Sequence, residues 1–183
     1  MTNEAQLLSR ARQLDPAALA EIYDLYNADI FRYASRQLGD AEMAEDCVAE
    51  TFSRLLHTLH RGGGPKDHLR AYLYRIAHNW ITDTFRSRVP PDLELNTDIL
   101  SDPHDQPEQA VERLLTNDHV RAALMKLTPD QRQVIVLRYI EGWPHKEIAQ
   151  SIKKPAGAVK ALQQRGIAAL RRILVEDETN DSV

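Results

Sequence analysis

The sequence has only one cysteine, Cys47, among 183 residues, and it has no apolar run near the roughly 20 residues that cross a bilayer. A single cysteine excludes an internal disulfide, and no cysteine–histidine spacing matches a zinc site. The N-terminus lacks the apolar segment of a signal peptide, so we expect a cytoplasmic protein. No stretch alternates with the period of a strand. These absences predict an all-α protein without cofactor or metal, in which Cys47 is a small buried hydrophobe.

Charge is distributed unevenly along the chain. The net charge of −4 argues against a general polyanion binder. Residues 151–174 nevertheless carry only basic charges, which are Lys153, Lys154, Lys160, Arg165, Arg171 and Arg172. Residues 89–109 carry only acidic ones, which are Asp92, Glu94, Asp98, Asp102, Asp105 and Glu108, together with four prolines. Prolines and like charges disfavour a helix, so residues 89–109 are predicted to be a linker between two domains.

Before this linker, apolar residues recur at helical spacing in three segments. The first stripe consists of Leu19, Ile22, Tyr23, Tyr26, Ile30, Tyr33 and Ala34. Gly39 then predicts a left-handed stop, and Asp40 predicts the cap of a second helix. The third helix is expected to bury Leu69, Tyr72, Leu73, Ile76, Trp80 and Ile81. The first domain is therefore predicted to be a helical bundle.

After the linker, the pattern predicts a helix over about 108–126, and then Thr128 as the cap of a helix that stops at Gly142, with Gln131 completing a capping box. A short helix over 145–152, a Pro-Ala-Gly break and a long helix follow, which together predict a helix-turn-helix. Val159, Leu162, Gly166 and Leu170 should face inward. Lys160, Gln164 and Arg165 should then face outward, with Gln164 and Arg165 suited to base edges and Lys153, Lys154 and Lys160 to phosphates.

Three segments together resemble a known family, the extracytoplasmic-function (ECF) sigma factors of bacterial RNA polymerase. "LTPDQRQVIVLRYIEGWPHKEIAQSIKKPAGAVKALQQR" resembles their −35-binding domain, "AEDCVAETFSRLL" their polymerase-binding helix, and "LRAYLYRIAHNWITDTFRSR" their −10-reading segment. The resemblance implies two small helical domains joined by the linker. They are region 2 over 16–88, after an N-terminal extension over 1–15, and region 4 over 110–176, before an acidic tail over 177–183.

The resemblance also implies roles for single residues. Asp46, Glu50 and Arg54 fall on the helix that binds core polymerase, where an acidic face suits a basic partner surface. Asn79 falls at a pocket for a flipped −10 base, whose Watson–Crick edge an amide can read. Arg75 lies beside it on a basic segment. Tyr74 either stacks on an unpaired base or is a tyrosine at the rim of the bundle.

An inhibitory anti-sigma protein is a further partner that the resemblance implies. Pro144 and Pro155 stand where the family commonly has serine caps, so both helix starts of the helix-turn-helix lack a side-chain acceptor. Two alternatives remain. A stand-alone helix-turn-helix regulator would leave the region 2 motifs unexplained. An enzyme is not expected, because no metal-ligand motif or phosphate-binding loop is present.

Overall fold

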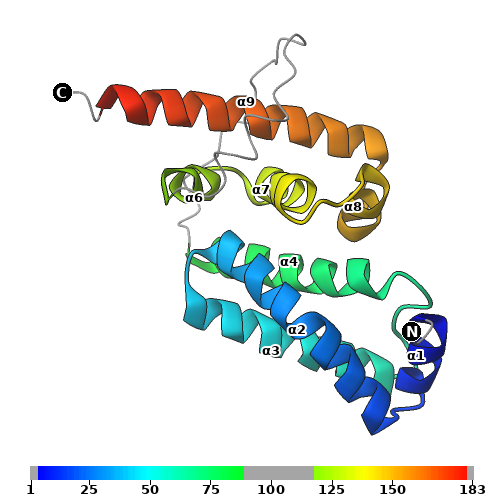
Figure 1. Ribbon diagram of the computed structural model, residues 1–183. Coiled ribbons are helices and arrows are strands. Elements are labelled where there is room, and N and C mark those ends of the chain that lie inside the picture. The colour runs from blue at the N-terminus through cyan, green and yellow to red at the C-terminus, as the bar shows by residue number, and fades with distance from the viewer. Residues whose placement is uncertain (1–3, 89–117, 181–183) are drawn as a thin grey trace. The chain divides into compact units, whose positions relative to one another are not determined.

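The computed structural model describes residues 4–88 and 118–180. Every regular element in these two ranges is a helix (Figure 1), as the sequence predicts. The chain divides after Arg88 into two compact units, Met1–Arg88 and Val89–Val183. The predicted linker over 89–109 lies outside the described residues. None of the helices that the structure describes is long and apolar enough to span a membrane.

The first unit contains α1 (Glu4–Arg12), α2 (Pro16–Leu38), α3 (Ala41–His60) and α4 (Leu69–Arg88). Asp15 caps α2 by accepting a hydrogen bond from the Ala17 amide at 3.0 Å. Gly39 ends α2 with a φ of 70°, in the left-handed region that glycine adopts without steric cost. Asp40 then caps α3 by accepting from the Met43 amide at 2.9 Å. The predicted stop and cap at Gly39 and Asp40 are thus confirmed.

The core of this unit forms where α2, α3 and α4 pack against one another. Its large buried side chains include Ile22, Ile30, Tyr33, Leu55, Leu69, Leu73, Tyr74 and Ile81. Each contributes roughly 1.5–3 kcal/mol by leaving water. The predicted core face of the third helix is partly wrong. Tyr72 and Trp80, which were expected in the core, are only half-buried, and Tyr74 and Ala77, which were not, are fully buried. The reason is that α4 contacts both α2 and α3, and so buries two sides.

The segment expected as an N-terminal extension folds as α1 and belongs to the first unit. Leu7, Leu8 and Ala11 are buried against the bundle. The Glu4 carboxylate accepts a hydrogen bond from the Leu69 amide at 3.1 Å, at the start of α4. Arg12 donates to the carbonyl oxygen of Pro65 at 2.8 Å. Both bonds link α1 to segments more than 50 residues away, which no local sequence pattern signals.

The second unit contains α6 (Asp118–Met125), α7 (Pro129–Ile135), the π-helical turn η1 (Val136–Ile140), α8 (His145–Ile152) and α9 (Ala156–Asn180). The expected helix over 108–126 is seen from Asp118 to Met125, and its earlier part lies outside the described residues. The capping box of Thr128 and Gln131 is confirmed. Because α9 continues to Asn180, residues 177–180 of the tail expected over 177–183 are helical, and 181–183 lie outside the described residues.

The predicted helix that ends at Gly142 changes its winding before it stops. The Glu141 amide donates to the carbonyl oxygen of Val136 at 3.0 Å, five residues back rather than four. Such a wide turn is rare and occurs frequently at functional sites. The chain then turns at Gly142, which has a φ of 68°, and buries Trp143.

The helix-turn-helix packs as expected, with Val159, Gly166 and Leu170 buried and Leu162 half-buried. Gly166 allows close approach of α9 to α7, because a Cβ there would lie 3.0 Å from Cγ1 of Ile135. Leu137, Trp143 and Ile148 complete the core of the unit.

A buried arginine joins α6 to α7. The Arg132 side chain is 3% exposed and donates to three carbonyl oxygens, those of Leu124 at 2.8 Å, Met125 at 3.0 Å and Leu127 at 3.1 Å. The Leu124 and Met125 carbonyls lie in the last turn of α6 and that of Leu127 just beyond it, where helical bonds run out, although the Leu124 carbonyl also accepts from the Leu127 amide at 3.1 Å. Arg132 therefore closes the end of α6 from the start of α7.

We expect the substitution Arg132→Lys to lower the free energy of unfolding of the second unit by about 2–4 kcal/mol, because an ammonium lacks the planar fork that reaches three carbonyls. Urea unfolding followed by tryptophan fluorescence measures this change. A Trp80→Phe background leaves Trp143, in the second unit, as the only tryptophan. The exposed control Arg165→Lys should change stability by less than about 0.5 kcal/mol. Equal stability of the two variants would contradict the structural role of Arg132.

Candidate nucleic-acid and protein interfaces

An acidic stripe runs along the exposed side of α3. The helix buries Ala44, Cys47, Thr51 and Leu55, and the residues directly before the last three of these lie at least partly exposed. Asp46, Glu50 and Arg54 follow one another at intervals of four residues, which places all three predicted polymerase-binding residues on one face. Asp46 is exposed, whereas Glu50 is half-buried and accepts a hydrogen bond from Arg54 Nε at 2.7 Å. The i, i+4 pair reduces the charge at the C-terminal end of the stripe.

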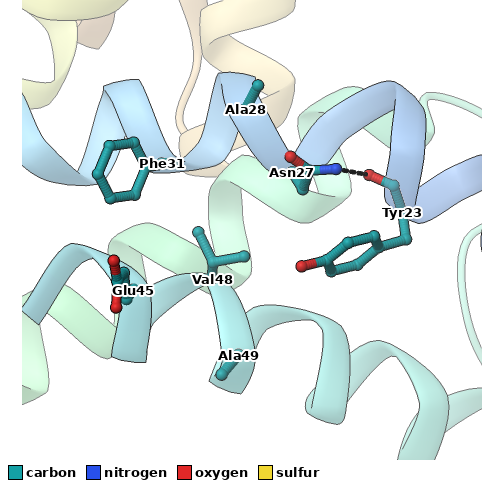
Figure 2. Close-up of a pocket in the computed structure, with 7 residues that line it drawn as sticks. All are labelled: Tyr23, Asn27, Ala28, Phe31, Glu45, Val48 and Ala49. Carbon is teal, nitrogen blue, oxygen red and sulfur yellow. Dashed lines mark hydrogen bonds between the residues drawn. The ribbon is translucent and has the colours of Figure 1, made fainter. Parts of the chain in front are cut away.

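A groove lies beside this stripe, between α2 and α3 (Figure 2). It has a volume of about 490 Å³ and is lined by Tyr23, Asn27, Ala28 and Phe31 from α2 and Glu45, Val48 and Ala49 from α3. The placement of Tyr23 in the core stripe is wrong, because its side chain is 47% exposed. Its ring instead contacts Phe52 at the edge of the core, with centroids 4.8 Å apart. The groove thus combines an apolar surface with an acidic side chain, Glu45.

A second stripe of side chains, partly exposed to solvent, lies on α4. Tyr72, Arg75 and Asn79 are spaced three and four residues apart, so they share one face of the helix. The Arg75 guanidinium lies over the Tyr72 ring, 5.0 Å from its centroid. Asn79 is exposed. The structure therefore brings the predicted residues Arg75 and Asn79 together and adds Tyr72, which the sequence pattern assigned to the core.

The predicted base-stacking role of Tyr74 is wrong. Its side chain is 0% exposed, and its ring packs against Tyr33 with centroids 4.9 Å apart. The Arg70 guanidinium lies 5.7 Å from the same ring. A base cannot reach a ring that is covered in this way, whereas the half-buried Tyr72 shares the face of α4 that carries Asn79.

The outward face of the helix-turn-helix carries all five residues predicted to bind DNA there. Lys153, Lys154, Lys160, Gln164 and Arg165 are exposed. Lys153 takes a left-handed conformation, with a φ of 53°, and ends α8. The Lys154 ammonium lies 3.3 Å from the Asp130 carboxylate, so part of its charge is already compensated within the unit. Lys160, Gln164 and Arg165 lie along successive turns of α9, on its exposed face.

Among the remaining reactive groups of the described ranges is the thiol of Cys47. Burial raises the pKa of the Cys47 thiol to about 12, so the thiol stays protonated at neutral pH. Cys47 is buried, as predicted. No group of three histidine, cysteine, aspartate or glutamate side chains in residues 4–88 and 118–180 could hold a metal ion.

Comparison with known families gives one match to each unit. Residues 22–89 match Sigma-70 region 2, and residues 123–172 match Sigma-70, region 4. Among curated proteins, the ECF RNA polymerase sigma factor SigL of Mycobacterium tuberculosis is 34% identical over 173 residues, which cover 92% of this chain and 96% of SigL. The ECF RNA polymerase sigma factor BldN of Streptomyces coelicolor is 31% identical over 175 residues, 94% of this chain and 66% of BldN.

Among solved structures, the chain is similar to CnrH, solved in complex with the cytosolic domain of CnrY. The TM-score is 0.68 at 25% sequence identity, and the match covers 94% of this chain and 97% of CnrH.

Proposed function

The chain belongs to the ECF sigma factors of bacterial RNA polymerase, and from this premise we propose how its surfaces share the work of transcription initiation. The first unit binds core polymerase and captures the melted −10 element, and the second unit binds the −35 duplex. The observation that carries this proposal is the placement of an acidic stripe with an apolar groove on one unit and a basic helix face on the other. A stand-alone regulator would have no use for the surfaces on α3 and α4.

The acidic stripe and groove of the first unit form the docking surface for core polymerase. An apolar hollow offers a place for a buried anchor residue of the partner, and exposed carboxylates at its edge select a basic surface. Asp46 supplies such a charge without an internal ion pair in the described contacts, whereas Glu50 shares its charge with Arg54. The groove residues Tyr23 and Phe31 supply the apolar contact.

Nucleic acid is read by two different chemistries. On α4, Asn79 offers an amide donor and acceptor to an unpaired base, with Arg75 and Tyr72 next to it. On α9, Gln164 and Arg165 suit bidentate contacts to base edges, while Lys153 and Lys160 suit phosphates. Lys154 contributes less to phosphate binding, because Asp130 already lies within 3.3 Å of its ammonium.

A protein inhibitor that covers the polymerase-binding surface is part of the proposal. CnrH, which shares the fold, was solved in complex with the cytosolic domain of another protein. In this chain, the α2–α3 groove and the Asp46 stripe are exposed. An anti-sigma protein that occupied them would compete with core polymerase for the same side chains.

The first test is binding to core polymerase. We expect the purified chain to co-elute in size-exclusion chromatography with bacterial core polymerase that lacks its own sigma factor, as a one-to-one complex. Asp46→Lys should weaken this complex by about 1–3 kcal/mol through like-charge repulsion. Asp67→Lys, an exposed charge reversal outside the stripe and groove, is the matched control. Absence of a complex, together with tight binding of the isolated chain to duplex DNA, would favour the stand-alone regulator.

The second test concerns the −35 element. Gln164→Ala and Arg165→Ala should each raise the barrier to −35-dependent initiation by about 1–3 kcal/mol, because each removes contacts to a base edge. The measurement is single-round transcription from a promoter that the holoenzyme selects from a randomised library, with the −35 element intact or scrambled. Arg171→Ala, an exposed change further along α9, is the control. Unchanged transcription from both variants would mean that the recognition face lies elsewhere.

The third test concerns the −10 element. Asn79→Ala should slow promoter opening, because the flipped base loses its hydrogen-bonding partner. Permanganate reactivity of unpaired thymines measures opening, and core co-elution should remain at the wild-type level. A pre-melted promoter should not restore the variant, since the lost contact is to the unpaired base. Loss of core binding would instead assign Asn79 a structural role.

A further inference from the structure

Three side chains from three elements of the second unit form a polar chain that the proposed recognition face does not include. Gln163 of α9 donates through Nε2 to the Tyr139 hydroxyl at 2.7 Å. Its Oε1 lies 2.5 Å from Nε2 of His145. Since Gln163 Oε1 can only accept, His145 Nε2 carries the hydrogen. The chain therefore links η1, the first residue of α8 and the middle of α9.

Both ends of the Gln163 amide are engaged inside the protein. Gln163 is half-buried, whereas its neighbour Gln164 is exposed. Successive residues of a helix differ by about 100° around its axis. Fixing the direction of Gln163 therefore fixes the directions of Gln164 and Arg165, the two side chains proposed to read bases.

The start of α8 lacks the side-chain hydrogen bond that usually holds the first turn of a helix. Its N-cap is Pro144, which has no side-chain hydrogen bond to the first turn. A serine or threonine there would normally bond a backbone amide and hold the helix start. His145 follows directly, and its bond to Gln163 ties this end of α8 to α9 instead.

Tyr139 lies in the π-helical turn, between Val136 and Ile140. A π turn holds more residues than an α turn, so it changes the direction in which its side chains leave the helix. In this chain the π turn carries Tyr139, whose hydroxyl accepts the hydrogen bond from Gln163 of α9. The second end of Gln163 is thus anchored on an element that does not contact DNA in the proposed function.

We propose that Gln163 is a positioning residue for promoter recognition, held between Tyr139 and His145 so that α9 presents Gln164 and Arg165 at one fixed angle to the −35 duplex. The inference rests on the proposed function of α9. It assigns the two neighbouring glutamines different tasks: Gln164 contacts DNA, and Gln163 sets the orientation of the helix that carries it.

The test is a double-mutant cycle in the holoenzyme, with the ratio of transcription from promoters with intact and scrambled −35 elements as readout. Tyr139→Phe keeps the ring and removes one bond, and Gln163→Leu removes both bonds. We expect Gln163→Leu to lower the ratio roughly fivefold to tenfold and Tyr139→Phe to lower it less. The two changes should not add, because both act through the same chain.

Gln164→Leu provides the matched control, since it removes the same side chain one position further on. Tyr139→Phe should still lower the ratio of this variant, because Arg165 remains to be oriented, but by less than it lowers the wild-type ratio, because one of the two oriented side chains is gone. His145→Gln keeps a donor for Gln163 and should stay near the wild-type ratio, whereas His145→Leu should lower it. Unfolding midpoints followed at Trp143 verify that every variant is folded at the assay temperature.

A second readout separates positioning from general stability. Selection from a library randomised in the −35 element should give Tyr139→Phe a flatter base preference than the wild type. Unchanged ratios and preferences for Tyr139→Phe and Gln163→Leu, with reduced ratios for Gln164→Ala or Arg165→Ala, would overturn the inference and leave the proposed function standing. If the Gln164 and Arg165 variants also had no effect, the proposed recognition face itself would be wrong.

Discussion

The buried guanidinium of Arg132 is the interaction on which the second unit depends. A small helical unit without a disulfide or metal must close the ends of its short helices with its own polar groups. Arg132 does this for α6, because its planar fork reaches three carbonyl oxygens at once. Arg132 belongs to α7, which also carries Ile135, the residue that Gly166 of α9 approaches closely. The helix that ties down the end of α6 is therefore the one against which the long helix α9 packs.

The separation of charge between different helix faces, rather than between the two units, explains how a protein of net charge −4 can work on DNA. In the proposed function, carboxylates gather on α3, where a protein partner docks, and lysines and arginines gather on α9, where phosphates lie. Free in solution, the acidic surface opposes DNA binding. Once core polymerase covers it, the two DNA contacts act through one tether, which raises their effective concentration and allows each to be modest.

Local signals in the sequence predicted the local features of the fold. Gly39, Asp40 and the Thr128–Gln131 box act within one turn of helix, so their residue types are enough to identify them. The failures concern contacts between distant segments. Tyr74 is buried because α4 packs on two helices, and Tyr23, 47% exposed, lines the groove between α2 and α3. The bonds from α1 to Pro65 and Leu69 likewise cross more than 50 residues. A single helical stripe carries no information on any of these.

Gln163 and Gln164 illustrate the same limit at the candidate site. The two residues have the same chemistry and stand side by side, and helical spacing correctly placed Gln164 on the outward face. What spacing could not show is that Gln163 is held by partners from two other elements, Tyr139 and His145, which engage both ends of its amide. Pro144 leaves the start of α8 without a side-chain cap, and the residue that follows it, His145, is bonded to Gln163. In the inference drawn above, the missing cap and the inward-facing glutamine are linked, because the bond that ties the start of α8 to α9 also fixes the angle of α9.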